Sequence, residues 1–146
     1  MDDHFLQLRV IYDDLPDLIE LGVRVVHGDW SALSTAYTSP TFLSDDCEGL
    51  LRWVDAPREP LQIEAGADTG IGRMALKFYT INHAGHARCA ITLARKLLKS
   101  EARPAETFRF AIELPTELGL IEHFARECIA LGTNFKREAR LIGLPD

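Results

Sequence analysis

Long apolar runs and a basic, apolar amino-terminal segment are both missing from this sequence. Its longest apolar runs are far shorter than the roughly 18 residues that a membrane-spanning helix requires. The first ten residues, MDDHFLQLRV, carry two early acids, whereas a secretory signal begins with basic residues followed by an apolar core. We therefore expect a cytoplasmic protein with no membrane partner.

Cysteine is scarce. Cys47, Cys89 and Cys128 are widely spaced, odd in number and without a CxxC pair. This pattern favours reduced, mostly buried thiols in a reducing compartment over a disulfide framework.

Motifs of catalysis and phosphate binding are absent as well. There is no G-x-S-x-G nucleophile turn, and GADTGIG (66–72) lacks the lysine and the Ser/Thr of a phosphate-binding loop. The acid pairs Asp2/Asp3, Asp13/Asp14 and Asp45/Asp46 are adjacent in sequence, whereas acid/base catalysis needs two carboxyls held apart across a cleft. We therefore predict no cofactor.

Bases are outnumbered, with 16 Lys and Arg against 22 Asp and Glu and a formal net charge of −6. An acidic chain disfavours nucleic acid as its main partner. The charge is uneven, because residues 1–72 hold 14 acids and 4 bases whereas residues 73–146 hold 8 acids and 12 bases. This asymmetry suits a charged protein partner or head-to-tail contacts between copies.

The length and composition of the chain indicate one globular domain. The chain has 146 residues, of which 47% are hydrophobic and 26% charged, and it contains no repeat or low-complexity linker. We predict a single domain over residues 1–146. Its core spans about 5–132, and a short tail, 133–146, forms a further short helix or frays.

Alternation of apolar and polar residues at period two predicts seven strands. They are expected near residues 5–12, 18–27, 30–38, 61–65, 71–81, 86–93 and 107–114. Short connections and alternation favour antiparallel pairing with one buried face.

Two amphipathic helices are predicted. The first follows Ser39 and Pro40, because the serine hydroxyl can cap a helix and proline fits its first position. The second lies within residues 114–132, with Thr116 as its cap. The resulting order, β-β-β-α-β-β-β-β-α, predicts an α+β fold in which a mainly antiparallel sheet of about seven strands is packed by two helices.

The segment INHAGHAR (81–88) contains the pair His83 and His86, which has the spacing of two zinc ligands. Its flanks favour another interpretation, since Asn82 and Gly85 occupy the first and fourth positions of a type I turn closed by a left-handed glycine. We therefore predict a hairpin corner with His83 exposed at the tip and His86 opening the next strand, and no metal site.

A second candidate site is a basic, partly aromatic face. It consists of the polar residues of the strands between 73 and 109, namely Arg73, Lys77, Tyr79, Arg88, Thr92 and Arg109. Two interpretations remain open. The face is either solvated and balanced by acids such as Glu113, or it binds an acidic protein surface or an anionic small molecule.

The order of segments resembles that of small uncharacterised bacterial proteins with an aromatic-containing hairpin, a helix, a hairpin containing GH and a terminal helix. The segments are VRVVHGDWSALSTAYTSP, LQIEAG, MALKFYTINHAGHARCAITL and FRFAIELPTELGLIEHF, within roughly residues 10–131. Such proteins are similar to families carried in mobile gene cassettes or encoded beside toxins, some of them immunity-like. The resemblance brings no catalytic residues.

Two functions follow from these observations. The first is a non-enzymatic module that binds another protein or associates with itself. The second is a small enzyme or ligand-binding protein with a pocket between sheet and helices, lined by residues such as Trp30, His83, His86, Tyr79 or Arg88.

Overall fold

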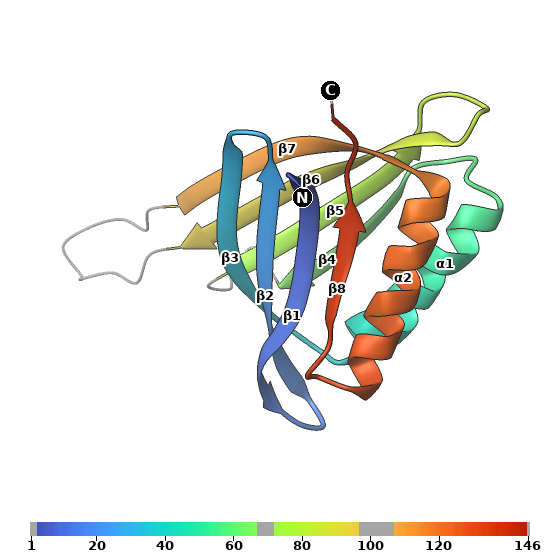
Figure 1. The fold of residues 1–146 in the computed structure, drawn as a ribbon. Helices are drawn as coiled ribbons and strands as arrows, with labels where there is room; N and C mark the ends of the chain where they lie inside the picture. Colours follow the sequence, from blue (N-terminus) through green and yellow to red (C-terminus); the bar gives the residue numbers. More distant parts are fainter. Residues whose placement is uncertain (1–2, 67–71, 97–106, 146) are drawn as a thin grey trace.

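The computed structural model describes residues 3–66, 72–96 and 107–145. Within these ranges the chain forms eight strands, two α-helices and one short π-helical turn (Figure 1). The strands make two four-stranded sheets in which every neighbouring pair is antiparallel.

The two sheets are named here by their strands in spatial order. Sheet A consists of β3 (Trp30–Thr38), β2 (Leu18–His27), β1 (His4–Asp14) and β8 (Glu138–Ile142). Sheet B consists of β4 (Leu61–Gly66), β5 (Gly72–Thr80), β6 (His86–Lys96) and β7 (Thr107–Glu117). The α+β class predicted from the sequence is confirmed.

The buried faces of the strands follow the alternation of the sequence. In β2 every second residue from Ile19 to Val25 is fully buried, and the residues between them include the exposed Arg24. In β6 every second residue from Ala87 to Leu93 is likewise buried. Successive side chains of a strand point to opposite faces, so each sheet turns one apolar face into a shared core.

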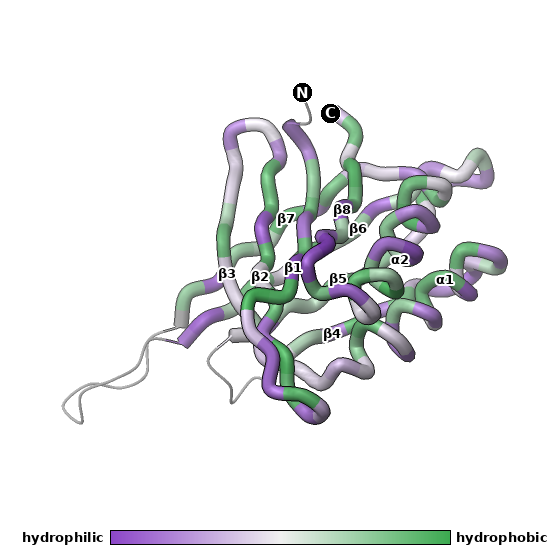
Figure 2. Tube along the Cα trace, turned by 60° about the horizontal axis from the view of Figure 1, so that its bottom comes forward, coloured by the Kyte–Doolittle hydropathy of each residue, from purple (hydrophilic) through white to green (hydrophobic). Residues whose placement is uncertain are grey.

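The helices close one side of the sandwich, and β3 lies on the opposite side (Figure 1). The π-helical turn Phe42–Asp46 leads into α1 (Cys47–Asp55), and α2 (Leu118–Thr133) packs against α1 and β8. Hydrophobic and hydrophilic residues alternate along both helices (Figure 2). The predicted helix cap at Ser39 is wrong: its Oγ accepts a hydrogen bond from the Thr41 amide at 3.2 Å, but the capping residues are Thr41 before the π-helical turn and Asp46 before α1, and neither makes a side-chain capping bond.

Three further features differ from the sequence-based expectation. The described strands number eight and divide between two sheets, and the predicted fraying tail contains β8, which pairs with β1. Thr116 does not cap a helix; it lies in β7, fully buried, and its hydroxyl donates to the Ile142 carbonyl at 3.0 Å. This bond and that from the Leu144 amide to the Pro115 carbonyl (2.8 Å) join the carboxyl-terminal segment to sheet B.

One backbone contact brings the two sheets together. Gly72, at the start of β5, lies so close to β3 that a Cβ atom there would stand 1.9 Å from the Thr35 carbonyl oxygen. No side chain fits in that space, so only glycine permits this approach of the sheets.

We predict that Gly72→Ala lowers the free energy of unfolding by about 2 kcal/mol, because the added methyl forces the sheets apart. Thermal and urea unfolding followed by circular dichroism measure the effect. Gly119→Ala is the matched control, since a Cβ at Gly119 meets nothing within 4 Å and alanine favours the helix. Equal stability of the two variants would contradict the tight contact.

Candidate interaction surface

The predicted basic face exists on sheet B. The register aligns Arg73 with Ala94 and Arg109 in one row, and Tyr79 with Arg88 in another. These residues, with Lys77 and Thr92, alternate with the buried residues of β5 and β6 and therefore share the outer face of the sheet.

Carboxylates contact this face at two points. Arg73 forms an ion pair with Glu64 of β4 at 2.6 Å. The Tyr79 hydroxyl donates to the Glu113 carboxylate of β7, and this hydrogen bond raises the pKa of Tyr79. The face is therefore mixed in charge, as its first interpretation expected.

The hairpin corner at residues 81–85 has the predicted form. Gly85 has a φ of 90°, and the Asn82 Oδ1 accepts hydrogen bonds from the amides of Ala84 (2.9 Å) and His86 (3.3 Å). His83 is exposed at the tip, and His86 is the first residue of β6. The described residues contain no group of three or more potential metal ligands.

An open cleft of about 680 Å³ lies between this corner and the ends of the two helices. Among the residues that line it are Asp55, Arg58 and His83. Of the predicted pocket-lining residues only His83 is found there. None of the described groups whose pKa is shifted lines the cleft, so no tuned acid or base converges on it.

We predict that replacing both His83 and His86 with alanine changes the free energy of unfolding by less than about 0.5 kcal/mol, because both side chains are exposed. Asn82→Ala should cost about 1 kcal/mol, since two backbone amides lose their acceptor. Thermal unfolding of both variants compares the costs. A larger loss in the histidine variant would show that the imidazoles stabilise the corner.

A different surface surrounds β3. This edge strand exposes Leu33 to 77% and Trp30 to 69%, and Tyr37 is also exposed. An edge strand that exposes large apolar side chains can pair with strands of other chains unless the edge is protected. Two grooves, one on each side of β3, share Ala32, Leu33 and Ser34 in their linings.

The outer groove, of about 660 Å³, lies on the solvent face of sheet A. Gly22 forms part of its floor, and Ile11 stands over that glycine because the register of β1 shifts between Val10 and Tyr12. Arg9 and Arg24 also line this groove. The Arg24 guanidinium lies 5.6 Å from the ring centre of Phe5, within cation–π distance.

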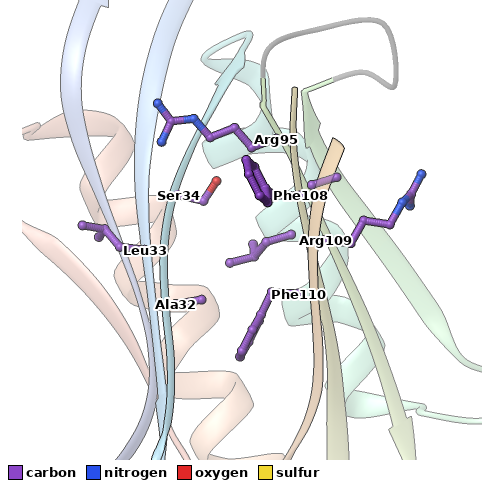
Figure 3. A pocket seen from close by; sticks show the side chains of 9 residues that line it. Ala32, Leu33, Ser34, Arg95, Phe108, Arg109 and Phe110 are labelled. Carbon is purple, nitrogen blue, oxygen red and sulfur yellow. The ribbon is translucent and has the colours of Figure 1, made fainter. Parts of the chain in front are cut away.

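The inner groove, of about 290 Å³, opens between the two sheets beyond the edge of β3. Phe108 and Phe110 point from β7 toward β3, whereas Arg109 points away from the gap (Figure 3). Arg95 extends from β6 over the same opening (Figure 3). Phe108 is 59% exposed although it lies on the inner face of its sheet, opposite Arg95.

The two grooves have charge of one sign. Among the described residues the charged ones that line the grooves are Arg9, Arg24, Arg95 and Arg109, of which Arg109 points away from the gap (Figure 3), and no described Asp or Glu is among them. In a chain of net charge −6 this is a local excess of positive charge beside apolar walls.

The other edge of sheet A is covered. The Arg140 amide of β8 donates to the Glu127 carboxylate of α2 at 3.0 Å. Outside its own sheet β3 packs on β5, β4 and β6, and its edge is turned to the inner groove. The strand is therefore the edge of sheet A that remains open to pairing.

Of the residues in this region, sequence reasoning identified Trp30 and Arg109, and it placed both with residues of sheet B. Leu33, Arg95 and Phe108 occupy ordinary strand positions, and only the distant pairing of strands brings them together. The sequence also separates His4 from His27, whose Nδ1 atoms lie 2.8 Å apart across the β1–β2 pair.

Comparisons with models of protein families, with curated proteins and with solved structures find no match to this chain. Among the described residues no helix is long and apolar enough to cross a membrane.

Proposed function

We propose that the chain is a non-enzymatic protein-binding module that receives its partner across β3. The observation that carries this proposal is the exposed edge strand with large apolar side chains, flanked on both sides by grooves. Trp, Tyr and Arg dominate the binding energy of protein interfaces, and Trp30, Tyr37 and Arg24 all belong to this region.

The rest of the molecule supports binding better than catalysis. Cys89 and Cys128 are fully buried, and this burial raises the pKa of both thiols, so neither serves as a nucleophile. All three cysteines are free, which fits the proposed bacterial cytoplasm. An immunity-like or adaptor role, in which one protein masks another, would use such a surface.

The proposal predicts that Leu33→Asp abolishes capture of the partner from an extract of the native host, because a charge would enter the apolar part of the interface. The tagged full chain serves as bait, and mass spectrometry quantifies captured proteins. Leu33 is exposed, so this variant should retain its thermal unfolding temperature within a few degrees.

Lys77→Glu, on the outer face of sheet B, is the matched control and should leave capture unchanged. A partner lost with Lys77→Glu but retained with Leu33→Asp would move the binding surface to sheet B and contradict the proposal.

A further inference from the structure

The turn before β3 determines which of its residues direct their N–H and C=O groups toward β2 and which direct them toward the open edge. His27 and Trp30 close a two-residue loop in which Gly28 has a φ of 61°, and such a closing pair bonds through both of its amides. Every second residue from Trp30 therefore turns its N–H and C=O toward β2. The intervening residues Ser31 and Leu33 turn theirs toward the open edge.

A further strand would find a floor beside this edge. The inner faces of β6 and β7 continue past β3 and line the groove there with Leu93, Phe108 and Phe110. Side chains of an added strand would alternate between this floor and the solvent face of sheet A. Those on the inner side would cover Phe108, which the chain itself leaves largely exposed.

The groove also contains an unsatisfied polar group. Ser34 is 7% exposed, and its Oγ has no hydrogen-bond partner among the described residues. A buried hydroxyl without a partner costs free energy, which a ligand that bonds to it recovers. The Ser34 side chain points into the gap between the sheets (Figure 3), so an occupant of the inner groove can bond to it.

The charge of the grooves selects the occupant. Among the described residues the charged side chains that border the grooves are those of Arg9, Arg24 and Arg95, so a second copy paired through β3 would bring arginines against arginines. An acidic segment meets complementary charge instead, and Arg95 stands at the opening of the groove that it would enter.

We infer that an extended segment of a partner protein, with alternating acidic and apolar residues, binds as a fifth strand of sheet A by pairing with Ser31 and Leu33. Its apolar side chains rest on Phe108 and Phe110. This inference rests on the proposed function and specifies the chemistry of the partner.

Panning a library of random ten-residue peptides against the immobilised full chain tests the inference. Enriched sequences should alternate Asp or Glu with apolar residues. Titration of the enriched peptide into the isotope-labelled chain should shift the amide signals of Ser31, Leu33, Ser34 and Phe108. Replacing Arg95 with Glu should weaken binding about tenfold, because attraction at the opening becomes repulsion.

Leu33→Pro removes one edge amide, which faces away from β2, and should weaken binding about tenfold. Leu33→Ala, which keeps the amide, separates the backbone from the side chain. If the proline variant does not fold, two peptides N-methylated at alternate amides, one for each edge of the peptide strand, make the same test. Methylation of the edge that pairs with β3 should abolish binding, and methylation of the other edge should leave it intact.

Enrichment of basic peptides, absence of enrichment, or binding equal in Leu33→Pro and Leu33→Ala would overturn the inference. The inference would also be overturned if sedimentation experiments showed that the chain forms a dimer and that Leu33→Pro is a monomer, since the occupant would then be a second copy. Loss of the host partner with Leu33→Asp but not with Leu33→Pro would overturn strand addition and leave the proposed function intact.

Discussion

The contact between Gly72 and the Thr35 backbone determines how the two sheets meet. Because residue 72 has no side chain, β5 reaches the edge strand of sheet A directly. Sheet B then continues past β3, and its inner face emerges on the far side as the floor of the inner groove. The exposure of Phe108 is thus a consequence of this packing, since the helices fill the opposite side of the sandwich.

The sheet edges formed by β8 and β7 are bonded to neighbouring segments of the chain, whereas the edge of β3 is not bonded in this way among the described residues. The edge of β8 is adjacent to α2, whose Glu127 accepts the hydrogen bond of an edge amide, and β7 is joined to the carboxyl-terminal segment through Pro115 and Thr116. Each of these bonds uses a group that would otherwise invite a foreign strand. The edge of β3 between Ser31 and Leu33 has no such partner among the described residues, so its pairing capacity remains available.

The features predicted from the sequence depend on neighbours in the chain. Alternation located the strands, and Asn82 with Gly85 located the corner, because each acts within a few residues. The division into two sheets depends on pairing between residues such as Leu6 and Leu141, which no local pattern encodes. The inner groove escaped prediction for the same reason, since Ser34 and Arg95, which both line it, come from different sheets.

The two candidate faces differ in what a partner would gain from them. On sheet B, Arg73 and Tyr79 already contact carboxylates, so an acidic partner would have to displace Glu64 and Glu113 and would gain little. Around β3 no acid is among the described residues that line the grooves, although Glu138 lies opposite Arg9 and Glu20 bonds to Tyr37, and the Ser34 hydroxyl is already desolvated. In the proposed mode, binding there adds attraction to Arg95, apolar burial and a hydrogen bond to Ser34, which is why we propose β3 rather than the face of sheet B as the interaction surface.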